Sequence, residues 1–167
     1  FVTMGNNHFI MRAIQAGEWE RARDYVGWLF EATRGYAIKV VNPGGVENWK
    51  WGKNVSALDD DVIGFNVTPR QIVQTLCRIN DDLGLPHVPH IQSLRLGQAG
   101  NAATMVEMIE ALEGRRAHFC HLQFLSYDGE GGRMRSGAER VAAAVNSHDN
   151  VTVDVGQVVF GPATTMT

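Results

Sequence analysis

The sequence predicts an α/β fold built on a parallel β-sheet, and three observations support this prediction. Four short apolar runs have the length of single strands and lie at residues 36–41, 88–93, 117–124 and 151–160. Segments whose apolar residues recur every three or four positions separate these runs and predict helices. The strands are spaced by roughly 30 to 50 residues, enough for a helical crossover between parallel strands. Both a doubly wound sheet and a (β/α)8 barrel satisfy this pattern.

Local signals place the helices. Residues 6–33 predict one amphipathic helix, or a pair of helices broken near Gly17. Thr68 is followed by a proline and, three positions on, by a glutamine, which predicts the start of a helix over residues 68–83. We expect the remaining helices at residues 101–112 and 136–145.

The composition is that of a soluble globular domain. The chain has 167 residues, of which 44% are hydrophobic and 20% charged, and its formal net charge is -3. This charge gives no electrostatic reason to expect nucleic acid or an anionic membrane as a partner. No apolar run is long enough to span a bilayer. Because the chain begins without an initiator methionine, we expect residues 1–167 to be a piece of a longer protein.

The two cysteines, Cys77 and Cys120, lie far apart in the sequence and form no Cys-x-x-Cys pair. This spacing argues against a disulfide scaffold and against a zinc-finger or iron–sulfur site. A reducing, cytoplasmic setting is the expectation that follows.

Function in a parallel α/β fold is carried by side chains at the carboxyl ends of the strands. The chain has no Gly-x-Gly-x-x-Gly after a strand and no phosphate-binding lysine after a glycine loop, so a nucleotide site loses support. The polar side chains near the strand ends include Lys39, His90, His121 and Asp154. A lysine and two histidines from three strands can converge on a metal ion.

Each of these side chains also has a purely structural interpretation. A lysine within a strand usually points to solvent. His90 could cap its strand, and His121 could be a hydrogen-bonded histidine of the core. For His118, at the edge of its strand, a surface role is the expectation.

The apolar residues of the segment 42–66 recur with no clear period, which predicts a long loop. Loops of this length are often functional. Asn42 follows its strand directly, and Trp49 lies within the loop. We predict both as ligand-binding residues, with simple packing as the alternative for the tryptophan.

The block Asn42-Pro-Gly-Gly-Val-Glu-Asn-Trp49 is long enough to be specific. With Gly84-Leu-Pro-His87 and Asn150-Val-Thr-Val-Asp-Val-Gly-Gln157, it resembles the amidohydrolase-type subunit of formylmethanofuran dehydrogenases and of bacterial formyltransferase/hydrolase complexes. The resemblance covers essentially the whole chain. These subunits belong to the amidohydrolase superfamily, so the resemblance implies about strands four to seven of an amidohydrolase-type (β/α)8 barrel.

The same resemblance implies an activity. It is hydrolysis, or formation, of the N-formyl amide of a methanofuran-like one-carbon carrier, with release or uptake of formate. The implied cofactor is a two-zinc centre in which carboxylated Lys39 bridges the metals and His121 is the ligand from the sixth strand, with His90 beside them. Asn42 and Trp49 would contact the carrier, and the implied partners are the other subunits of the complex.

Three residues depart from the family pattern, and one of them is Leu94, which replaces a polar residue. Gln92 stands where the fifth strand of the family has an imidazole, and Leu125 stands where a further histidine is expected. A glutamine carbonyl is a poorer zinc ligand than an imidazole. The alternative hypothesis is therefore a non-catalytic paralogue with a degenerate metal site, kept as a scaffold in the same complex.

Overall fold

Five short strands pair side by side, all parallel, into one sheet. In the computed structural model, which describes residues 1–156, they are β1 (Val2–Thr3), β2 (Ile38–Val41), β3 (His90–Gln92), β4 (Ala117–Phe119) and β7 (Val151–Val153). Their order in the sheet is also their order along the chain. A doubly wound sheet reverses its strand order at a switch point, whereas a barrel does not. The topology is thus that of a barrel segment.

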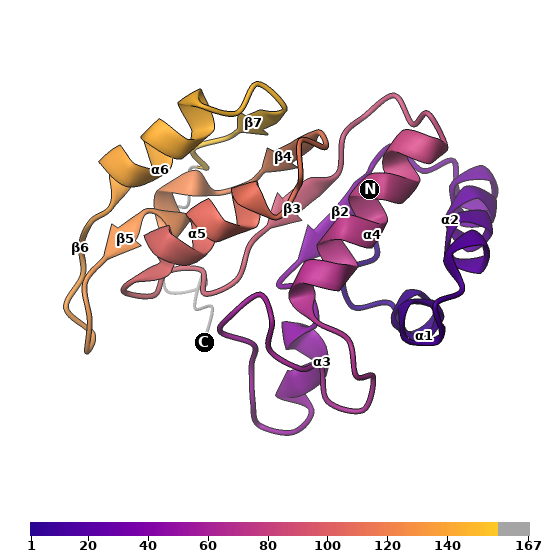
Figure 1. The fold of residues 1–167 in the computed structure, drawn as a ribbon, viewed down its shortest axis with the longest axis horizontal. Helices are drawn as coiled ribbons and strands as arrows, with labels where there is room; N and C mark the ends of the chain where they lie inside the picture. The colour runs from indigo at the N-terminus through magenta and orange to yellow at the C-terminus, as the bar shows by residue number, and fades with distance from the viewer. Residues whose placement is uncertain (157–167) are drawn as a thin grey trace.

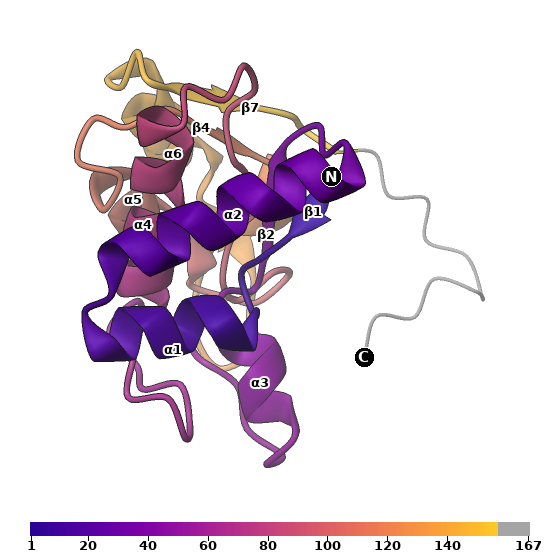
Figure 2. The ribbon, with the colours of Figure 1, turned by 90° about the vertical axis from the view of Figure 1, so that its right-hand side faces the viewer.

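Helices connect the strands and cover one face of the sheet (Figures 1 and 2). Figure 2 shows α4, α5 and α6 together on one side of it. The long helices are α1 (His8–Ala16), α2 (Trp19–Thr33), α4 (Pro69–Asp82), α5 (Asn101–Glu110) and α6 (Ala138–Asn146).

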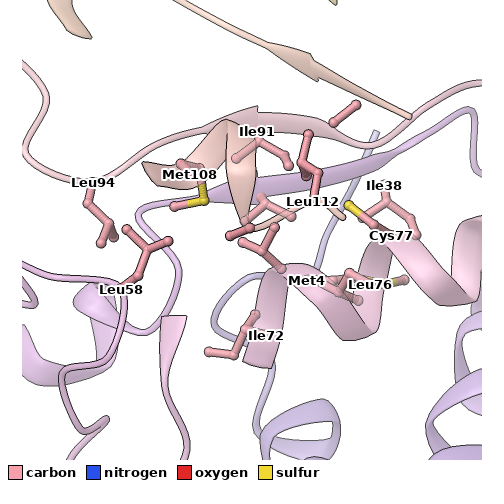
Figure 3. Packing of buried hydrophobic residues seen from close by; sticks show 14 of the residues in the cluster. Met4, Ile38, Leu58, Ile72, Leu76, Cys77, Ile91, Leu94, Met108 and Leu112 are labelled. Atoms are coloured by element: carbon pink, nitrogen blue, oxygen red, sulfur yellow. The ribbon is translucent and has the colours of Figure 1, made fainter. Parts of the chain in front are cut away.

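The core lies between this face of the sheet and the helices. Ile38, Ile91 and Phe119 point from neighbouring strands into it and are fully buried. Leu76 of α4 and Met108 of α5 pack into the same cluster (Figure 3). Each fully buried side chain of this size contributes about 1.5–3 kcal/mol, so burial of this face is what holds the sheet to its helices.

The predicted helix ends are confirmed at two places. Gly17 takes a left-handed conformation with φ 69° and separates α1 from α2, so residues 6–33 form a pair of helices. At α4 the Thr68 side chain accepts from the backbone N–H of Gln71, and the Gln71 side chain accepts from the backbone N–H of Thr68. This reciprocal capping satisfies two backbone donors at the helix start.

Four details differ from the sequence-based expectation. The two-residue strand β1 is too short to give an alternating pattern, and it makes five strands where four were expected. Residues 42–66 contain a short helix, α3 (Gly45–Trp49), below the length at which helical periodicity can be recognised. Residues 126–137 contain a hairpin of β5 (Tyr127–Asp128) and β6 (Arg135–Ser136).

The fourth difference is the end of β4, at Phe119 rather than at residue 124. His121 has a left-handed φ of 63°, which turns the chain into the 3-10 turn Leu122–Leu125. β7 ends at Val153, and residues 157–160 of the predicted last strand lie outside the described residues.

Candidate metal centre on the open face of the sheet

A row of polar side chains crosses the face of the sheet that the helices leave uncovered. Successive side chains of a strand point to opposite faces, so buried Val40, Ile91 and Phe119 lie on the helical side and their neighbours along each strand on the other. The strand register aligns those neighbours, in order, as Thr3, Lys39, His90, His118 and Thr152.

Cys120 lies beside this row, towards the carboxyl ends of the strands. Its backbone N–H donates to the carbonyl of Ile91, which continues the pairing of β3 and β4 past Phe119. Its side chain is on the polar face, and the residue is 4% exposed. Lys39 Nζ donates to the Cys120 sulfur at 3.1 Å, and His90 Nδ1 lies 4.0 Å from the same sulfur. Three strands therefore meet at this thiol.

His90 and His118 stand next to each other, with ring centroids 4.6 Å apart and planes inclined by 40°. Burial, together with the positive charges of His118 and Lys39, lowers the pKa of His90 below that of a free imidazole. His90 is therefore neutral at physiological pH, and the neutral imidazole is the form that binds metals.

Asp154 holds His118 in place. Its Oδ2 lies 3.1 Å from His118 Nε2, and Thr152 Oγ1 lies 2.9 Å from His118 Nδ1. Asp154 Oδ1 also accepts from the backbone N–H of His121 at 2.8 Å. Burial opposes ionisation of Asp154, but the hydrogen bonds from His121 and His118 outweigh it and keep the pKa of this carboxyl below its usual range. In metal sites, a carboxylate commonly accepts a hydrogen bond from the other ring nitrogen of a ligating histidine, the one that does not bind the metal, and so fixes the orientation of the ring.

The donor set fits a divalent metal. One ligand atom each from His90, His118 and Cys120 can be chosen so that all lie within 4.8 Å of one another. Imidazole nitrogen and thiolate sulfur are the usual ligands of Zn²⁺. The arrangement can thus supply at least three converging donors, with Lys39 adjacent to them.

The structure brings together two of the three predicted ligands, Lys39 and His90. His121 lies at the margin, since its Nδ1 is 4.0 Å from Asp154 Oδ1. Within residues 1–156 this buried Nδ1 makes no hydrogen bond.

The expectation that His118 has a surface role is wrong. Its side chain is 19% exposed and lies between His90 and Asp154. The signal was present in the alternation His118-Phe119-Cys120, which places the apolar Phe119 on one face and its two polar neighbours on the other.

Asn42 and Trp49, the two residues predicted to bind a ligand, differ in their exposure to solvent. Asn42 is 8% exposed, and its Nδ2 donates to Asn54 Oδ1 at 3.0 Å, while its own Oδ1 has no partner among the described residues. Trp49 is 54% exposed at the end of α3, which projects from the body of the fold in Figure 1. Asn42 is thus built into the end of β2, and Trp49 presents a free surface.

A sequence profile described as the amidohydrolase family matches residues 1–167. The chain belongs to the amidohydrolase family. The chain is 41% identical over 175 residues to Protein FwdA of Methanocaldococcus jannaschii, and the match covers 98% of the chain and 31% of that protein. It is 37% identical over 170 residues to a second relative, which is a subunit of the formyltransferase/hydrolase complex Fhc of Methylorubrum extorquens. That match again covers 98% of the chain and 31% of the relative.

The fold of the chain is also that of a solved relative. The crystal structure of the formyltransferase/hydrolase complex FhcABCD from Methylorubrum extorquens, in complex with methylofuran, contains a chain that superposes with a TM-score of 0.90 at 36% identity. The match covers 95% of the present chain and 30% of that relative. The present chain therefore spans less than a third of the length of these relatives. Among its described residues, every helix is too short or too polar to cross a membrane.

Proposed function

We propose that this amidohydrolase segment belongs to a subunit that hydrolyses or forms the N-formyl amide of a methanofuran-like carrier, with formate as the second product. The observation that carries the proposal is the row of Lys39, His90 and His118 on the open face of the sheet, with Cys120 beside it. One relative that matches 98% of the chain is named for formyl transfer and hydrolysis. Amide hydrolysis is chemistry that such a donor set supports.

The proposed metal site uses Lys39 and His90 as the sequence analysis predicted, and adds His118. When bound there, zinc supplies Lewis acidity and lowers the pKa of water. Carboxylation of Lys39 and ligation by His121 remain predictions of the family resemblance. Asp154 orients the His118 imidazole, and its lowered pKa keeps it ionised for that role.

We also propose the surroundings of the site. Asn42 and Trp49 are the proposed contacts for the carrier, because one offers an amide oxygen without a partner among the described residues and the other an exposed indole. Further subunits and the rest of a (β/α)8 barrel would close the open face, since a partial barrel leaves unpaired strand edges. The two free cysteines suit a cytoplasmic setting.

The scaffold alternative rests on Gln92, Leu94 and Leu125. Leu94 and Leu125 are both fully buried in the apolar core, so neither can be a missing ligand at the row. Only Gln92, the end residue of β3, lies where a lost imidazole would matter. The observations on the site therefore favour the catalytic hypothesis.

The experiment is a formate-release assay on the intact complex that contains this chain. The substrate is an N-formyl furfurylamine-type carrier, and the matched control is the N-acetyl carrier. We expect formate from the first substrate and much slower release of acetate from the second. A well-folded complex in which this subunit binds no metal, and which neither releases formate nor forms the N-formyl carrier from formate, would favour the scaffold alternative.

A further inference from the structure

We infer that Cys120 is itself a metal ligand, binding through its sulfur together with the imidazoles of His90 and His118. This inference rests on the proposed function, because it assigns a ligand of the same site. It gives the site a mixed sulfur and nitrogen donor set, in which a thiolate from the extension of β4 supplies a negative charge directly at the metal.

The separations of the donors favour this assignment. Tetrahedral zinc, with bonds of about 2.3 Å to sulfur and about 2.0–2.1 Å to nitrogen, holds its ligands roughly 3.3–3.6 Å from one another. The distance from the Cys120 sulfur to His90 Nδ1 is 4.0 Å, and the ligand atoms of the three residues all lie within 4.8 Å. Side-chain rotations that move each donor by about 1 Å or less therefore suffice to close the site.

The surroundings of Cys120 differ from those of an ordinary buried cysteine. Cys77, on the buried side of α4, packs in the apolar core, and burial raises the pKa of its thiol to about 12. Cys120 is 4% exposed, yet Lys39 Nζ donates to its sulfur at 3.1 Å and an imidazole lies on its other side. Cys120 is therefore a buried cysteine with polar groups on two sides of its sulfur, whereas Cys77 has apolar neighbours.

Metal binding at this site replaces the thiol proton, which leaves to solvent. Lys39 Nζ, which donates to this sulfur, lies next to the same proposed metal position. His118 has Asp154 on Nε2 and Thr152 on Nδ1, so metal binding would replace one of these two contacts and leave the other to orient the ring.

The test is cobalt substitution in the intact subunit within its complex, followed by absorption spectroscopy. A thiolate ligand gives an intense sulfur-to-cobalt charge-transfer band in the near ultraviolet. We expect this band in the unmodified protein and in Cys77→Ser, and its loss in Cys120→Ser. Because Cys120→Ser removes a ligand, cobalt affinity should also fall by at least about tenfold in a chelator competition.

A second variant keeps the test decisive if Cys120→Ser does not fold. Cys120→Asp retains an anionic ligand, so we expect bound cobalt without the sulfur band. A charge-transfer band that persists in Cys120→Ser or Cys120→Asp would overturn the inference. Cobalt-loaded, formate-releasing protein without any sulfur band would also overturn it while leaving the proposed function intact. Protein that binds no metal and releases no formate would overturn both.

Discussion

His90 and His118 face each other across the paired strands β3 and β4, with ring centroids 4.6 Å apart. Two imidazoles this close cannot both be protonated without repulsion, and the charge of His118 contributes to the lowered pKa of His90. A neutral His90 ring has a nitrogen lone pair available to a metal ion, which is the role that the proposed site gives it.

Replacement of His118 tests the part of the site that sequence analysis missed. We expect His118→Ala to lower the metal affinity of the intact subunit by at least about tenfold, because one of three converging donors is removed. Chelator competition measures the change. His148→Ala is the matched control, since His148 lies after α6 and, among the described residues, its side chain hydrogen-bonds only to its own helix end and to Ser147. Equal affinity in the two variants would remove His118 from the site.

Asp154→Asn tests whether the carboxylate that contacts His118 contributes to metal affinity. Asparagine keeps the size of the side chain but removes the charge that faces His118 Nε2 at 3.1 Å. We expect metal affinity to fall by about 10- to 100-fold, with little change in the folding of the subunit. Metal titration and circular dichroism of the same sample measure the two effects. Unchanged affinity would show that Asp154 serves only to hold the His121 backbone.

Glu47 should make the stability of the subunit sensitive to acid. Its carboxyl is buried, which opposes ionisation, but hydrogen bonds from Lys50 and His8 outweigh burial and lower its pKa. A carboxyl whose pKa is lower in the folded state stabilises the fold above its unfolded pKa and loses that contribution as the pH falls through the folded pKa. We expect Glu47→Gln to cost about 1–3 kcal/mol near pH 7 and progressively less below about pH 4.5.

Denaturant unfolding at several pH values measures this difference. The control is Glu110→Gln, at the exposed end of α5, for which we expect no comparable change. A Glu47→Gln cost that stays constant from pH 7 to pH 3 would contradict the assigned ion pairing.

Gly45 should tolerate no side chain. A Cβ atom at this position would lie 2.3 Å from Asn42 Nδ2 and 2.4 Å from Asn54 Oδ1, which are hydrogen-bonded to each other. We expect Gly45→Ala to separate that pair, to destabilise the subunit by about 1–3 kcal/mol and to weaken carrier binding. Thermal unfolding and carrier titration measure both effects.

Gly27→Ala is the control for this substitution. Its Cβ would meet Leu83 at 3.6 Å, an ordinary contact, and Gly27 lies within α2. Alanine should therefore be neutral or stabilise the helix by about 0.5–1 kcal/mol. Similar losses in the two variants would mean that the Asn42–Asn54 contact has no special role.

The sequence predicted the helices and the parallel sheet well because their signals are local. The capping residues at Thr68 and the break at Gly17 act within one helical turn, so the structure reproduces both. The sequence did not predict β1, which has two residues, or α3, which has five, because such short elements show no periodic pattern. The early end of β4 depends on the left-handed φ of His121, and histidine does not signal such a turn as a glycine does.

The candidate site was only partly predictable because it depends on register. Lys39 and His90 were placed by their positions near strand ends, and the structure brings them into one row. His118 and Cys120 needed the pairing of β3 with β4, which a single sequence does not specify. Without that pairing, the sequence favoured His121 over His118 as the partner of His90.

Metal analysis combined with formate release, on the intact complex and on its Lys39→Ala variant, is the decisive experiment for the proposed metal site. We expect about two zinc ions per subunit in the unmodified protein, as the family resemblance implies, with loss of metal and of formate release together in the variant. Full formate release by a Lys39→Ala complex, or an active unmodified complex without metal, would contradict a metal-dependent activity at Lys39.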